Sequence, residues 1–81
     1  MQLEAVMNHE IEKNIGNNVR KLREKNGITQ DMLAARLQVL GCDVTRSALA
    51  KIEVGQRHLY PDEIIAIKTA LGVEYSDIFD V

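Results

Sequence analysis

Two segments in the middle of the chain share one pattern, because each begins at a residue that can cap a helix and ends at a glycine. The first begins at Thr29 and ends at Gly41; the second begins at Asp43 or Thr45 and ends at Gly55. A side-chain oxygen at a helix start accepts hydrogen bonds from unpaired backbone amides, and glycine suits the helix end. Each start is followed by apolar residues three or four positions apart, namely Leu33, Leu37 and Leu40, then Leu49 and Ile52. The pattern predicts two short helices joined by a turn.

The second predicted helix has a polar face opposite its apolar residues. Arg46, Ser47 and Lys51 lie on that face. In a helix-turn-helix, the second helix lies in the major groove of DNA and its N-terminal residues contact the base edges. Arginine can donate two parallel hydrogen bonds to guanine, and serine can hydrogen-bond to either donors or acceptors on the base edges. The methyl group of Thr45 can contact thymine. These side chains predict a DNA-reading surface, with Arg46 as its principal member.

The remaining segments also show helical periodicity. A first helix is predicted from about Glu10 to Lys25, closed by Asn26-Gly27, with an apolar face made of Ile11, Ile15, Val19 and Leu22. A fourth helix is predicted to begin at Pro61 and to end at Gly72. A last short turn, capped by Ser76, is expected to run through Ile78 and Phe79. No strand pattern competes, so the expected fold is all-α with five helices.

The length of the chain sets its organisation. The 81 residues are enough for one domain with a single core. We expect an N-terminal extension over residues 1–10 and a helix-turn-helix DNA-binding domain over residues 11–81. The single cysteine, Cys42, forms no intrachain disulfide and is interpreted as a small, partly buried apolar residue. No signal peptide and no apolar run long enough for a membrane span is evident, so we expect a cytoplasmic protein without a membrane partner.

The charge of the chain is unevenly distributed. Although the net charge is -2, the part from Val19 to His58 has eight basic and four acidic residues. The part from Leu59 to Val81 has a balance of -4, and the first 18 residues have a balance of -2. Such a distribution can turn one positive face toward a polyanion, although charge of this kind is also found on ordinary solvated helix faces.

From Ile15 to Phe79, the chain resembles the lambda repressor-like, Cro-type helix-turn-helix domains (XRE family) of bacterial and phage regulators. The resemblance is carried by Gly27-Ile28-Thr29-Gln30, by Val44-Thr45-Arg46-Ser47 and by Ala70-Leu71-Gly72-Val73, in this order and spacing. It implies a sequence-specific transcriptional regulator that binds double-stranded DNA, with repression as the expected outcome. A palindromic operator bound by a homodimer is also expected, since one such domain reads a half-site.

The resemblance also implies roles for individual residues. The base-reading positions of the family match Thr45, Arg46, Ser47 and Lys51. Gln30 matches a glutamine that contacts a DNA phosphate and braces the reading helix. Gln56 and Arg57 lie in a loop where the family makes further phosphate contacts.

Three further positions match structural residues of the family. Ala34 matches a small residue that lets the two helices of the motif cross closely. Arg23 and Glu53 match a salt bridge between the ends of the first and third helices. Replacing Glu53 by alanine should lower the thermal midpoint clearly if that bridge is buried.

One segment departs from the family pattern. Residues 38–43 stand where the family commonly has a single glycine between the second and third helices. The simplest account is a second helix longer by about one turn, followed by a wider loop.

Other functions are less well supported by the sequence. Two separated histidines and one cysteine offer no nucleophile with a base beside it, so we expect neither an enzyme nor a cofactor. A metal site at His58 is not expected, because too few other potential metal ligands are available, and a solvated loop histidine is the default.

The alternative function is a protein-binding module of the same fold, such as an antitoxin or the partner of another regulator. Its contacts would be sought among Val73, Tyr75, Ile78, Phe79 and Val81, which can equally be core or self-association residues.

Overall fold

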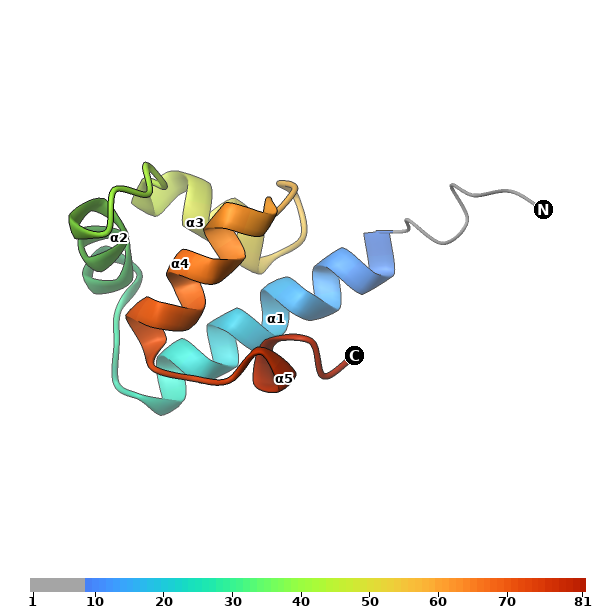
Figure 1. Ribbon diagram of the computed structural model, residues 1–81. Coiled ribbons are helices and arrows are strands. Elements are labelled where there is room, and N and C mark those ends of the chain that lie inside the picture. The colour runs from blue at the N-terminus through green and yellow to red at the C-terminus, as the bar shows by residue number, and fades with distance from the viewer. Residues whose placement is uncertain (1–8) are drawn as a thin grey trace.

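A computed structural model describes residues 9–81 as a bundle of five helices (Figure 1). In chain order they are α1 (His9–Lys25), α2 (Gln30–Val39), α3 (Arg46–Glu53), α4 (Pro61–Leu71) and α5 (Tyr75–Ile78). No strand occurs among these residues, which confirms the predicted all-α class. Residues 1–8 of the predicted N-terminal extension lie outside the described part, and residues 9 and 10 belong to α1.

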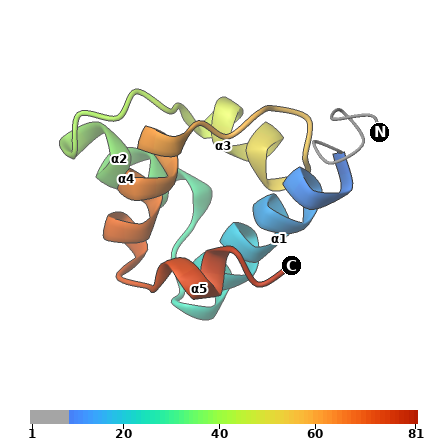
Figure 2. The same cartoon turned by 45° about the vertical axis from the view of Figure 1, so that its right-hand side comes forward.

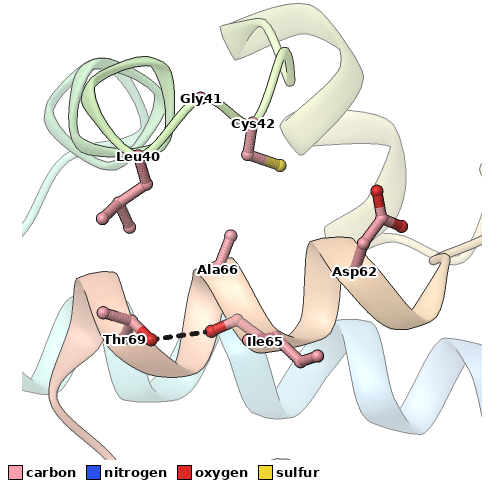
Figure 3. Close-up of a pocket in the computed structure, with 7 residues that line it drawn as sticks. All are labelled: Leu40, Gly41, Cys42, Asp62, Ile65, Ala66 and Thr69. Atoms are coloured by element: carbon pink, nitrogen blue, oxygen red, sulfur yellow. Dashed lines mark hydrogen bonds between the residues drawn. The ribbon is translucent and has the colours of Figure 1, made fainter.

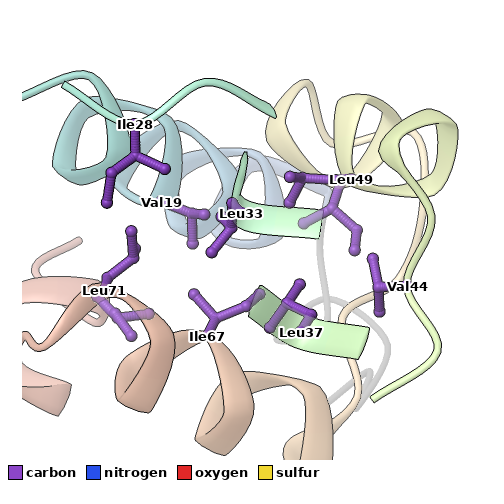
Figure 4. Close-up of a cluster of buried hydrophobic side chains, with 10 residues drawn as sticks. Val19, Ile28, Leu33, Leu37, Val44, Leu49, Ile67 and Leu71 are labelled. Carbon is purple, nitrogen blue, oxygen red and sulfur yellow. The ribbon is translucent and has the colours of Figure 1, made fainter. Parts of the chain in front are cut away.

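The helices enclose one core. Helix α3 packs on α1 and on α2, α2 packs on α4, and the short α5 packs against α1 (Figures 1 and 2). Apolar side chains from α1, α2, α3 and α4 point toward one another in the centre (Figure 4). The residues that are completely enclosed, with side chains out of contact with solvent, are Val19, Leu33, Leu37, Val44, Leu49, Ile52, Ile67 and Ile78.

The threonine caps are formed as predicted. The hydroxyl of Thr29 accepts a hydrogen bond of 3.1 Å from the Met32 amide, and that of Thr45 accepts one of 3.1 Å from the Ala48 amide. Of the two caps considered for α3, the structure therefore uses Thr45. These bonds satisfy backbone donors that have no partner within the helix.

Leu40 and Ile11, two residues of the predicted apolar faces, are exposed. Leu40 is 47% exposed because α2 ends at Val39, and Leu40 is its C-terminal cap rather than the next residue of its apolar face. Ile11, near the start of α1, is 39% exposed.

The longer connection between α2 and α3 is held by the chain itself. The Gln38 side chain donates hydrogen bonds to Asp43 Oδ1 at 3.2 Å and to the Val44 carbonyl oxygen at 3.3 Å. Helix α2 continues two residues past Leu37, and the chain then turns at Gly41, whose φ is 78°. The turn lies over α4, where the pocket shown in Figure 3 is lined by Leu40, Gly41, Cys42, Asp62, Ile65, Ala66 and Thr69. The added residues thus form a turn that is bonded to Gln38 and faces α4 across this pocket.

The C-terminal end differs from its predicted capping. Ser76 lies inside α5, and the cap residue is Glu74, whose amide donates to Asp77 Oδ2 at 3.0 Å. The Asn18 side chain of α1 donates to the carbonyl oxygens of Ile78 at 3.0 Å and Asp80 at 2.9 Å. Asn18 therefore ties this end of the chain to α1. Within residues 9–81, the structure has no helix with the length and apolarity required to cross a lipid bilayer.

Candidate nucleic-acid interface

Helix α3 presents the predicted reading residues to solvent. Arg46, Ser47 and Lys51 are exposed, while Leu49 and Ile52 on the opposite face are buried. The hydroxyl oxygen of Thr45 accepts the cap hydrogen bond, so its O–H donor and its methyl group are left for other contacts. The first turn of α3 therefore carries a cation, a hydroxyl and a methyl group on an accessible surface.

A buried ion pair holds the end of α3 against α1. Arg23 Nε donates to Glu53 Oε2 at 2.8 Å and Arg23 Nη2 donates to Glu53 Oε1 at 2.9 Å, with side chains only 9% and 1% exposed. Arg23 Nη1 also donates to the carbonyl oxygen of Ile28 at 2.8 Å. The hydrogen bond to Glu53 raises the pKa of Arg23, so the guanidinium stays charged. Two parallel bonds fix the direction of both side chains.

Gln30 joins this network from the first turn of α2. Its Nε2 donates to Glu53 Oε1 at 3.0 Å, so the residue expected at a DNA phosphate also braces α3. Ala34 is buried, and its expected role in the close crossing of the two helices of the motif stays a prediction. The resemblance implied that Gln30 braces the reading helix, but it did not name Glu53, 23 positions away, as the partner.

Gly16 sets the spacing between α1 and α3. A Cβ atom at this position would lie 2.1 Å from the carbonyl oxygen of Ile52, far inside van der Waals contact. Only glycine lets the backbones of the two helices approach this closely. The sequence contained a signal for this contact in a glycine inside a helical pattern, which often marks a packing requirement.

The loop between α3 and α4 contains a second ion pair. Arg57 Nη1 and Nη2 donate to the two carboxylate oxygens of Glu63, each at 2.9 Å, and Nη1 also donates to the His58 carbonyl oxygen at 3.0 Å. Glu63 Oε1 further accepts a hydrogen bond of 3.0 Å from the Tyr60 amide, at the start of α4. The structure therefore gives Arg57, expected at a DNA phosphate, a partner within the chain. Gln56 beside it is exposed, and phosphate contacts by both residues stay predictions.

Replacing Glu63 by glutamine should make the thermal stability of the protein less dependent on pH. The hydrogen bond from Arg57 lowers the pKa of Glu63 below its ordinary value. Because the folded pKa lies below the unfolded value of about 4.3, this group stabilises the fold above about pH 4.3. That contribution is lost as the pH falls through the folded pKa. Thermal melts of wild type and Glu63→Gln between about pH 3 and about pH 7 should therefore differ most near neutrality and converge in acid. A difference that stays constant over this range would contradict the assignment.

His58 is an exposed loop residue, as the sequence suggested, but it also contacts two other side chains. Its Nδ1 contacts a carboxylate oxygen of Glu12 in α1, and its ring lies edge-on to Tyr60 at 4.8 Å between centroids. Among residues 9–81, no group of three or more His, Cys, Asp or Glu side chains is placed to hold a metal ion.

Cys42 is partly buried in the turn before α3. Burial raises the pKa of its thiol, as do the nearby carboxylates of Glu63 and Asp62. The thiol is therefore protonated at neutral pH, in keeping with a packing role.

Comparison with known proteins agrees with this geometry. Residues 19–78 match the family model HTH_3, described as helix-turn-helix. Control protein C.BamHI of Bacillus amyloliquefaciens is 35% identical over 75 residues, which cover 91% of this chain and 86% of that protein. The crystal structure of the restriction-modification controller protein C.AhdI from Aeromonas hydrophila superposes with a TM-score of 0.77 at 30% identity, covering 88% of this chain and 96% of the other. The chain belongs to this helix-turn-helix family and is a sequence-specific DNA-binding transcriptional regulator.

Proposed function

We propose that this protein controls genes of a restriction-modification system by binding a palindromic operator as a homodimer. The observation that carries the proposal is the exposed surface of α3, with Arg46 and Ser47 in its first turn and Lys51 in its last turn. The buried network of Arg23, Gln30 and Glu53 holds the end of this helix in place. The class of genes is suggested by the two relatives, a control protein and a restriction-modification controller protein.

The geometry supports a division of roles within the interface. Arg46 would donate two hydrogen bonds to guanine, while Ser47 and Lys51 would contact neighbouring base edges and the Thr45 methyl a thymine. Gln30, Gln56 and Arg57 would contact phosphates and set the orientation of α3. One α3 spans only a half-site, so a two-fold dimer with its α3 helices about 34 Å apart would read a palindrome.

Replacing Arg46 by alanine should weaken operator binding by about 1–3 kcal/mol, because two hydrogen bonds to a base are lost. The operator would first be selected from a pool of random duplexes and then titrated at two salt concentrations. Wild-type binding should weaken as salt rises, because counterions are released from the phosphates.

Arg20→Ala is the matched control, since Arg20 is an exposed arginine on α1 that pairs with Glu24. This variant removes the same charge and should change operator affinity little. Equal losses for both variants would show that Arg46 acts only through its charge. A palindromic sequence in the selected operator would support binding as a homodimer.

The alternative, a protein-binding module of the same fold, is supported by exposed apolar residues at the C-terminal end. Ile78 belongs to the core, but Tyr75, Phe79 and Val81 are exposed around α5. Failure to enrich any duplex from the random pool would favour this alternative over operator binding.

A further inference from the structure

An acidic residue of α2, Asp31, lies beside Arg46, the principal reading residue of α3. Asp31 Oδ1 is 3.6 Å from Arg46 Nε, and the two side chains are 79% and 62% exposed. Asp31 is the second residue of α2 and Arg46 the first residue of α3. The pair thus joins the first turns of the two helices of the motif.

The position of Asp31 complements that of its neighbour Gln30. Gln30 bonds to Glu53, the last residue of α3, whereas Asp31 pairs with the first residue. Residues 46 and 53 share one face of α3, because seven positions are about two helical turns. Two consecutive residues of α2 therefore reach both ends of the same face of the reading helix.

Stability does not account for the Asp31–Arg46 pair. An ion pair exposed to this degree contributes little to folding, because water and salt screen it. The Asp31 carboxylate does, however, lie 3.6 Å from Nε of the guanidinium that the proposed function assigns to guanine. Substitution of Asp31 should therefore change the affinity for DNA and not the stability of the fold.

We propose that Asp31 is a specificity-determining residue that acts through Arg46, an inference that rests on the proposed function. On non-cognate DNA, Arg46 can contact only the phosphate backbone, and the Asp31 carboxylate competes for the guanidinium and repels the phosphates. On the operator, guanine O6 and N7 supply two well-placed neutral acceptors that replace the carboxylate. Asp31 thus weakens non-cognate binding more than operator binding, and specificity is the difference between the two affinities.

The test compares Asp31→Asn, Arg46→Ala and the double variant with wild type. Each protein is titrated against the selected operator and against a shuffled duplex of equal length, at about 50 mM and about 200 mM salt. Asp62→Asn is the matched control, because Asp62 is an exposed aspartate at the second position of α4, as Asp31 is of α2.

We expect Asp31→Asn to tighten binding to the shuffled duplex about threefold more than binding to the operator, with a smaller effect at the higher salt concentration. This loss of discrimination should disappear in the Arg46→Ala background, while the thermal midpoint stays that of wild type. Asp62→Asn should leave the ratio of the two affinities unchanged.

The inference is overturned if Asp31→Asn leaves the ratio of the two affinities unchanged, as expected for the control. It is also overturned if Asp31→Asn changes this ratio equally with and without Arg46. A new base preference at a position that Arg46→Ala does not affect would make Asp31 a base-reading residue. If wild type itself fails to prefer the selected operator to the shuffled duplex, the proposed function fails as well, and the two failures are thereby distinguished.

Discussion

Glu53→Ala should reduce the free energy of unfolding by about 3–5 kcal/mol. The variant leaves the guanidinium of Arg23 buried without its carboxylate and removes the acceptor of Gln30. In a domain of this size, each kcal/mol lowers the thermal midpoint by about 4–8 °C. Thermal and urea unfolding followed by circular dichroism would measure the effect.

The control for this prediction is Glu24→Ala. Glu24 also pairs with an arginine, Arg20, but both side chains are 53% exposed, so its loss should cost at most about 1 kcal/mol. A double variant, Arg23→Met with Glu53→Leu, removes both charges and should recover part of the stability, because no unpaired ion is left buried. A melting curve of Glu53→Ala that matches that of Glu24→Ala would show that the buried pair contributes nothing.

Gly16→Ala should also destabilise the fold, by about 2–3 kcal/mol. Inside a helix, replacing glycine by alanine ordinarily stabilises by about 0.5–1 kcal/mol, so the expected sign is reversed. The reason is the Ile52 carbonyl oxygen at 2.1 Å from the added Cβ, which belongs to the backbone of α3 and cannot rotate away. Helices α1 and α3 must therefore separate, and operator affinity should fall with stability because α3 shifts.

Asn14→Ala provides the comparison, since Asn14 is an exposed residue of the same helix. It should be neutral or slightly stabilising. Urea unfolding of both variants decides the matter. If Gly16→Ala were as stable as Asn14→Ala, the close approach of α1 and α3 would not limit the side chain at position 16.

Much of this fold could be predicted because its signals are local. A cap such as Thr29 or Thr45 bonds to an amide three residues away, and residues such as Leu33 and Leu37 share a face through helical spacing alone. The failures were also local in origin. Leu40 continues the spacing of Leu33 and Leu37, but spacing does not show that α2 ends at Val39.

For the candidate site, the exposure of the reading residues could be predicted from the sequence, but most of the ion pairs around them could not. Exposure of Arg46, Ser47 and Lys51 follows from the apolar face of α3, which must turn inward and leaves these residues outside. The Arg23–Glu53 pair was expected only from the resemblance, since residues 30 positions apart have no local relation. The partners of Arg57 and His58 were not expected at all.

The sequence by itself determined the helices, their inward faces and the residues that α3 exposes, because capping and periodicity act within a few residues of the chain. Tertiary structure alone decided that Gln30 bonds to the same Glu53 carboxylate as Arg23, that Arg57 pairs with Glu63, and that Asp31 lies beside Arg46. It also decided that Gly16 must lie against the backbone of α3. These contacts depend on the angles and distances at which whole helices pack, and such quantities are set by the complete core.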